Sequence, residues 1–142
     1  MAKGRFVEEY RKGAVNGASP LQLVIMLYDG ALRFMEGGKA AIIAKDLDKQ
    51  NYNLQKAQRI IAELISCLDI NQGGEIARNL LALYTFVTEE LVNANLHDDP
   101  NRVAVCIRIM TDLRSTWTEL ESSLRAPVEA AEIQAVETQV AA

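Results

Sequence analysis

Residues 18–34 read ASPLQLVIMLYDGALRF and contain both the start of a helix and a wide apolar surface. Ser19 is a preferred N-cap residue, Pro20 suits the first helical position, and Gln22 completes a capping box with Ser19. Seven apolar residues follow with a period of 3.6 residues: Leu21, Val24, Ile25, Tyr28, Ala31, Leu32 and Met35. The pattern predicts a first helix from residue 20, continuing to about residue 43 with a bend at Gly37-Gly38.

Three further apolar stripes with helical spacing follow. Asp46-Leu47-Asp48 predicts a turn and N-cap before a second helix, residues 71–74 predict a loop, and Asp99-Pro100 predicts the start of a fourth helix. Pro127 is expected just after its end. The three stripes comprise Leu54, Ala57, Ile61, Leu64, Ile65 and Leu68; Ile76, Leu80, Leu83, Val87 and Leu91; and Val103, Cys106, Ile107, Met110, Leu113, Trp117, Leu120 and Leu124.

Four long helices with short connections predict an all-α fold, an antiparallel up-down four-helix bundle over residues 19–125. Residues 1–18 mix charges, glycines and a few apolar residues, and we expect a mobile N-terminal segment there. Residues 126–142 carry three glutamates and no basic residue, so either a frayed acidic tail or a short fifth helix fits.

Composition excludes several classes of protein. The chain has 142 residues with a net charge of −4, which offers no electrostatic footprint for nucleic acid. No apolar run approaches the ~20 residues that cross a bilayer, and the N-terminus lacks the apolar core of a secretory signal. Cys67 and Cys106 are far apart in sequence, and both are expected to be small core residues of a reduced cytosolic protein.

The chain carries no constellation typical of an enzyme, and no cofactor or metal is expected. A single histidine, His97, lies beside Asp98-Asp99 at a predicted helix end, where a structural role is favoured over catalysis. Phosphotransfer through His97 remains a minor alternative. Asp29 and Arg33 are expected to form an i,i+4 ion pair, and Trp117 is expected to pack in the core.

The helices are more apolar than a bundle requires. A bundle helix needs one apolar stripe, yet several large apolar residues fall outside the stripes. Wide stripes could explain this excess, and so could surface grooves that accept amphipathic segments of another chain. A self-associating structural or regulatory bundle, with a homodimer of the free chain, is a further alternative.

The sequence resembles the flagellar secretion chaperones of the FliS family over about residues 5–122. The resemblance is carried by residues 18–34, 56–64, 73–80 and 82–84, by Ala94-Asn95 and the Asp99-Pro100 break, and by Leu113-Arg114 followed by Trp117. One departure is at Ala44-Lys45-Asp46, where the family usually has a small residue and Gly-Asp.

The resemblance implies a cytosolic, non-enzymatic export chaperone with a four-helix bundle. Members bind the disordered C-terminal segment of flagellin, prevent early polymerisation and aid delivery to the type III flagellar export apparatus. We expect partner-binding residues at Tyr10, Leu23, Leu27, Ile60, Leu81, Tyr84, Phe86 and Ile109. Phe6, Val7 and Tyr10 are expected to form an N-terminal lid over part of the groove.

Overall fold

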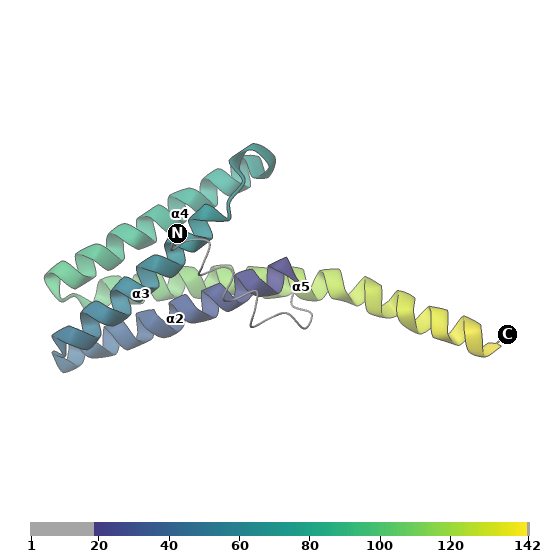
Figure 1. The fold of residues 1–142 in the computed structure, drawn as a ribbon, viewed down its shortest axis with the longest axis horizontal. Coiled ribbons are helices and arrows are strands. Elements are labelled where there is room, and N and C mark those ends of the chain that lie inside the picture. The colour runs from purple at the N-terminus through teal and green to yellow at the C-terminus, as the bar shows by residue number, and fades with distance from the viewer. Residues whose placement is uncertain (1–18, 142) are drawn as a thin grey trace.

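The computed structural model describes residues 19–141, except the side chains of 125–132, 135 and 139–141. The described chain forms four helices and no strand: α2 (Pro20–Ala44), α3 (Leu47–Ser66), α4 (Ile70–His97) and α5 (Pro100–Ala141). Two or three residues connect successive helices, so neighbours in sequence run antiparallel (Figure 1). The predicted all-α bundle is confirmed.

Local hydrogen bonds set the helix starts as predicted. The backbone N–H of Gln22 donates to Ser19 Oγ at 3.1 Å, and the Ser19 N–H donates to Gln22 Oε1 at 2.8 Å, which completes the capping box. Asp46 caps α3 by accepting from the Lys49 N–H at 3.2 Å. These bonds satisfy N–H groups that a helix leaves without intrahelical partners.

Gly37 and Gly38 allow α2 to approach α3 closely. The predicted bend is absent from the structure, since α2 runs without interruption through both residues. A Cβ atom on Gly38 would lie 2.5 Å from Leu54 Cδ2, and one on Gly37 would lie 2.8 Å from Asn53 Oδ1. The missing side chains therefore make room for α3 rather than weakening α2.

The predicted loop at residues 71–74 is largely helical. α4 begins at Ile70, capped by Asp69, and its helical geometry is interrupted only at Gly74, with φ 55° and ψ −129°. A positive φ of this kind suits glycine. The break separates a first turn from the long body of α4.

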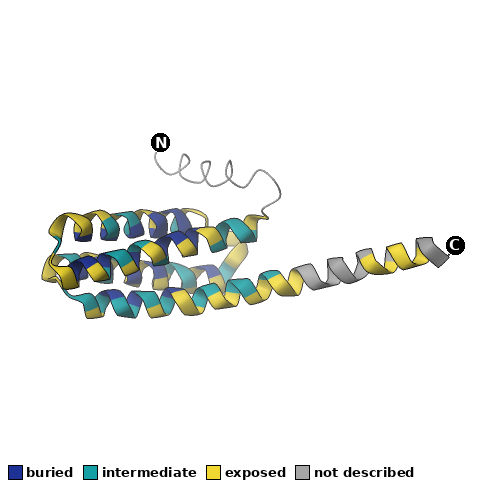
Figure 2. Ribbon diagram, turned by 90° about the horizontal axis from the view of Figure 1, so that it is seen from below, coloured by how far each residue is buried: buried dark blue, intermediate teal, exposed yellow. Residues whose placement is uncertain are grey.

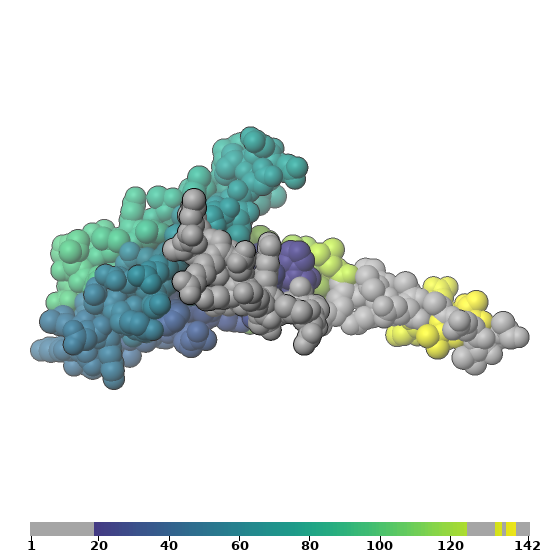
Figure 3. Space-filling model, viewed as in Figure 1, coloured from purple at the N-terminus to yellow at the C-terminus, as the bar shows by residue number. Residues whose placement is uncertain are grey.

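Among the four described helices, α2 packs on α3 and α5, and α4 also packs on α3 and α5. The pair α3–α4 diverges from the pair α2–α5 toward the end where α4 begins, so the bundle is forked in Figure 1. In the space-filling view the beginning of α4 stands clear of α5 (Figure 3). We call this the open end, and the end with the α2–α3 and α4–α5 connections the closed end.

α5 is longer than predicted. We expected the helix to end before Pro127, but it continues to Ala141 and projects beyond the other helices (Figures 1 and 2). A proline removes one backbone N–H donor, and the Ala- and Glu-rich sequence that follows Pro127 favours continuation of the helix. The predicted boundary at residue 125 therefore falls inside one continuous helix.

Candidate functional site

The buried core stops short of the open end. It is continuous from the closed end up to Leu27 and Tyr28 on α2, Leu64 on α3 and Tyr84 on α4. On α5 the last described buried residue is Met110. The apolar stripes continue past these residues, but the helices that carry them diverge.

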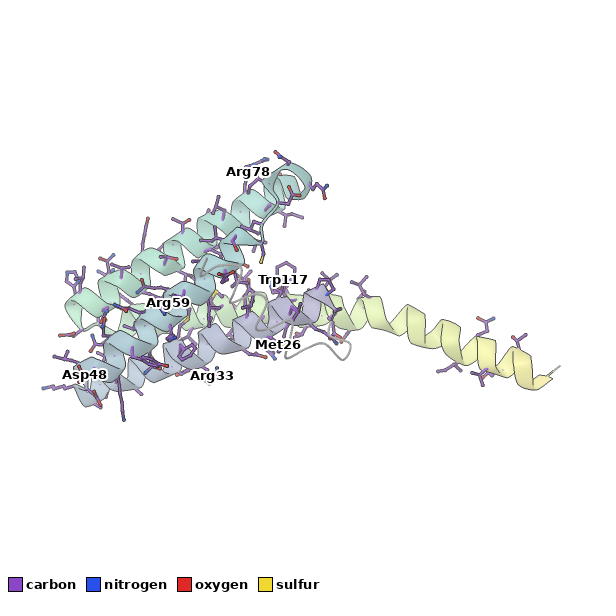
Figure 4. The ribbon with its side chains drawn as sticks, in the orientation of Figure 1. Met26, Arg33, Asp48, Arg59, Arg78 and Trp117 are labelled. Atoms are coloured by element: carbon purple, nitrogen blue, oxygen red, sulfur yellow. The ribbon has the colours of Figure 1, made fainter. Side chains whose placement is uncertain are left out.

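Beyond this limit the exposure of apolar residues varies: Ala77 is buried, Ile76, Leu120 and Leu124 are exposed, and Ile65 and Leu68 on α3 are half-buried. Eight further apolar side chains, on α2, α4 and α5, are also half-buried. We call them the open-end surface: Leu21, Leu23, Val24 and Ile25 on α2, Leu80 and Leu81 on α4, and Leu113 and Trp117 on α5. Figure 4 shows Trp117 at this end of the bundle. Apolar surface of this kind, contributed by three helices, suits binding of another apolar segment.

Two tyrosines mark where the core ends. Tyr28 and Tyr84 reach across the bundle from α2 and α4, helices that have no direct backbone contact, and their hydroxyl groups lie 2.5 Å apart. Trp117 adds an edge-on contact with Tyr28 at 6.4 Å between ring centroids. Burial raises the pKa of both tyrosines, so the hydroxyls stay protonated and can share a hydrogen bond.

Three predicted partner-binding residues are core residues instead. Leu27, Ile60 and Tyr84 are 4%, 0% and 2% exposed, respectively. The prediction placed them on the surface because they lie outside a 100° stripe, but a helix flanked by two neighbours is covered over a wider arc. Their burial contradicts the expectation that they line surface grooves.

Four predicted residues retain accessible surface. Leu23 and Leu81 belong to the open-end surface, Ile109 is half-buried on α5, and Phe86 on α4 is 42% exposed. The lid residues Phe6, Val7 and Tyr10 lie outside the described residues. The prediction assigned the other six residues of the open-end surface wholly to the core: Leu21, Val24, Ile25, Leu80, Leu113 and Trp117.

Three further expectations need correction. Asp29 pairs with Arg114 of α5 and not with Arg33, which lies over the Phe34 ring at 5.3 Å. Cys67 is exposed, whereas Cys106 is buried as expected. Trp117 packs against the core but is only partly buried, and no acceptor lies within hydrogen-bonding geometry of its buried Nε1 among the described residues.

Polar contacts reinforce the closed end. The buried Gln50 amide on α3 donates to Asp98 Oδ1 at 2.8 Å and to Asn95 Oδ1 at 3.1 Å. Arg102 of α5 donates to Glu90 of α4 at 3.0 Å. The Gln50 contacts hold α3 to the end of α4, and the Arg102–Glu90 contact joins the α3–α4 pair to α5 at the closed end.

Among the described residues we find no arrangement typical of catalysis. His97 lies at the end of α4, where its Nδ1 donates to the Asn93 carbonyl oxygen at 3.0 Å. Within the described residues, no group of three or more His, Cys, Asp or Glu side chains could hold a metal ion. No helix in residues 19–141 is both long and apolar enough to cross a membrane.

A forked helical bundle with half-buried apolar side chains at its open end is typical of proteins that bind another chain. Comparison with known proteins is specific: the family model described as flagellar protein FliS matches residues 3–124. The chain belongs to the FliS family.

Curated relatives named flagellar secretion chaperone FliS support this assignment. The Bacillus subtilis protein is 36% identical over 116 residues, covering 82% of this chain and 86% of the relative. The Vibrio cholerae protein is 35% identical, covering 80% and 87%. The Campylobacter jejuni protein is 34% identical, covering 80% and 89%.

Proposed function

We propose that this chain is a cytosolic export chaperone that binds the C-terminal segment of flagellin on its open-end surface. Bound flagellin would be kept from polymerising and passed to the type III flagellar export apparatus. The observation that carries the proposal is that apolar residues of three helices continue past the end of the core and stay half-buried. Family membership supplies the identity of the partner.

The energetics suit a ligand that is bound and later released. Burying a large apolar side chain contributes about 1.5–3 kcal/mol, so a few side chains from each docked helix suffice for binding. Ordering a disordered segment costs about 2–5 kcal/mol or more, which keeps the complex dissociable. Phe6, Val7 and Tyr10 are proposed to cover part of this surface in the free protein, so deletion of residues 1–12 should change the affinity for flagellin.

The test is calorimetric titration of the full chain with the C-terminal segment of the flagellin encoded in the same genome. Leu23→Glu and Leu81→Glu should each weaken binding at least about tenfold, since a charge in an apolar contact is costly. Ile43→Glu is the matched control, because Ile43 is 65% exposed near the closed end of α2.

Circular dichroism should show that all three variants remain folded. Absence of binding by the unsubstituted chain would refute flagellin as the partner. Equal weakening by Ile43→Glu and by the two open-end variants would refute the proposed site.

A further inference from the structure

A second surface lies along the contact between α2 and α3 and combines aromatic rings with positive charge. The Phe34 and Tyr52 rings meet edge to face, with centroids 6.3 Å apart. The Arg33 guanidinium lies 5.3 Å from the Phe34 centroid, and the Lys56 ammonium lies 5.6 Å from the Tyr52 centroid. Arg59, one turn beyond Lys56 on the same side of α3, is exposed. We call these five residues the basic–aromatic face.

The three cations of this face lack acidic partners in the described part of the chain. Arg33, Lys56 and Arg59 form no ion pair with any described residue. Asp29, one turn before Arg33 on α2, is held by an arginine of α5, and Glu36, one turn after Arg33, is exposed and not paired with it. In a chain with a net charge of −4, three unpaired cations around two rings make a local positive surface.

The basic–aromatic face is accessible and partly apolar. Tyr52 is 58% exposed, and Phe34 is half-buried. Met26 lies two turns before Arg33 on the same side of α2 and is 37% exposed, so it extends the apolar part of the surface. Figure 4 places Arg33 and Arg59 on the adjacent helices α2 and α3. A cationic surface with exposed rings suits a ligand that has both carboxylates and apolar groups.

The spacing of the cations favours a helical ligand. Lys56 and Arg59 are three positions apart on α3, which is about 4.5 Å along the helix axis. Carboxylates three or four positions apart on a second helix have nearly the same spacing, whereas residues on one side of an extended strand are about 6.6 Å apart. The Arg33 guanidinium lies over a ring and keeps N–H donors at its edge for a further carboxylate.

We propose that the basic–aromatic face binds an acidic amphipathic helix of a partner protein other than flagellin. Exposed ion pairs alone are weak, so apolar side chains of that helix contact Phe34, Tyr52 and Met26 and supply the attraction, while the charges set its orientation. The basic–aromatic face shares no residue with the open-end surface. Both surfaces can therefore be occupied at once, and this inference does not depend on the proposed binding of flagellin.

The test is the fluorescence anisotropy of a labelled probe peptide, Glu-Glu-Leu-Leu repeated four times, titrated with the full chain to about 1 mM. The unsubstituted chain should bind the probe, and added salt should weaken binding. Arg33→Glu/Lys56→Glu should weaken binding at least about tenfold through like-charge repulsion, and Tyr52→Ala should also weaken it through lost apolar contact. Arg78→Glu/Arg108→Glu, with both arginines exposed elsewhere on α4 and α5, is the matched control and should leave binding unchanged.

Two comparisons show what is recognised and where. A peptide of the same length made only of glutamate should bind at least about tenfold more weakly, because it offers no apolar side chain. Leu23→Glu should leave the affinity for the Glu-Leu probe unchanged, because Leu23 belongs to the open-end surface. Failure of this inference is thereby distinguished from failure of the flagellin proposal.

Several results would overturn the inference. These are absence of probe binding up to about 1 mM, equal binding of the glutamate peptide, and loss of binding in Leu23→Glu but not in Arg33→Glu/Lys56→Glu. Tighter binding of phosphatidylglycerol vesicles or single-stranded DNA than of the probe, lost in the same double variant, would assign the face to a membrane or to nucleic acid instead. Circular dichroism checks that each variant is folded, and the single substitution Arg59→Glu, at an exposed position, should weaken probe binding even if the double variant unfolds.

Discussion

The two cysteines illustrate how position decides the chemistry of identical residues. Cys67 ends α3 and is exposed, whereas Cys106 is buried, with its thiol 3.7 Å from the Val87 carbonyl oxygen. Burial raises the pKa of the Cys106 thiol from its usual 9 to about 12. Cys106 therefore lacks both access and the reactive thiolate at neutral pH.

We expect alkylating reagents at pH 7.5 to modify Cys67 and leave Cys106 intact in the folded chain. Mass spectrometry of digested protein after brief treatment with iodoacetamide would locate the label. In urea both residues should react, which is the internal control. Early labelling of Cys106 under native conditions would contradict its burial.

Lys45 occupies a backbone conformation better suited to glycine. It ends α2 with φ 58° and ψ 34°, in the left-handed region, and its N–H donates to the Ile42 carbonyl oxygen. At this position the FliS family usually has the glycine of a Gly-Asp pair, whereas this chain has Lys45. Left-handed geometry costs a non-glycine residue roughly 1–2 kcal/mol.

Lys45→Gly should therefore raise the free energy of unfolding by about 0.5–1 kcal/mol, since glycine relieves that cost but gains freedom when unfolded. Asp98→Gly is the matched comparison, because Asp98 has a similar φ of 50° but accepts a hydrogen bond from Gln50. Asp98→Gly should not stabilise the chain. Urea denaturation of both variants measures the difference.

At the scale of helices, adding a side chain at Gly37 or at Gly38 should affect the packing of α2 on α3 differently. Gly38→Ala should lower the free energy of unfolding by about 1 kcal/mol, because its Cβ would press on the fully buried Leu54. Gly37→Ala should be neutral or stabilising, since Asn53 is half-buried and its amide can move, and alanine favours helix. Thermal unfolding compares the two, and equal effects would argue against close packing at Gly38.

The link between α2 and α4 is testable through the two tyrosine hydroxyls. Tyr28→Phe and Tyr84→Phe should each cost about 1–3 kcal/mol, because each leaves a buried hydroxyl without its partner. The double variant should cost less than the sum of the two, since it leaves no orphaned hydroxyl. Additive costs in a double-mutant cycle would show that the hydroxyls are not coupled.

Local sequence signals predicted the helix starts well, and burial less well. The capping box at Ser19 and the Asp46 cap involve residues three positions apart, so the sequence alone contains the complete interaction. The burial of Leu27 and Ile60 depends on two flanking helices, whose positions no periodicity specifies. Similarly, Val24 lies on a regular stripe, but divergence of the helices leaves it half-buried.

For the whole molecule, stability should fall as the solution becomes alkaline. Burial raises the pKa of Cys106, Tyr28 and Tyr84 in the folded chain. Above about pH 9 the unfolded chain releases protons that the folded chain retains, so the unfolded state binds fewer protons and the free energy of unfolding decreases. The loss reaches about 1.4 kcal/mol per pH unit for each retained proton.

Urea unfolding from pH 8 to pH 11 checks this behaviour. Cys106→Ala lowers the overall stability but should make the decline shallower between pH 9 and pH 11, because one of the three retained protons is removed. An unchanged slope in this variant would mean that the Cys106 thiol does not titrate as its burial indicates.

The forked shape has a practical consequence through Trp117. It is the chain's one tryptophan, and it sits half-buried on the open-end surface beside Tyr28. An indole ring in such a place has an emission spectrum that depends on the water around it. The wavelength of intrinsic fluorescence should therefore shift to the blue when any ligand fills the fork, giving the chain its own optical reporter of occupancy without an added dye.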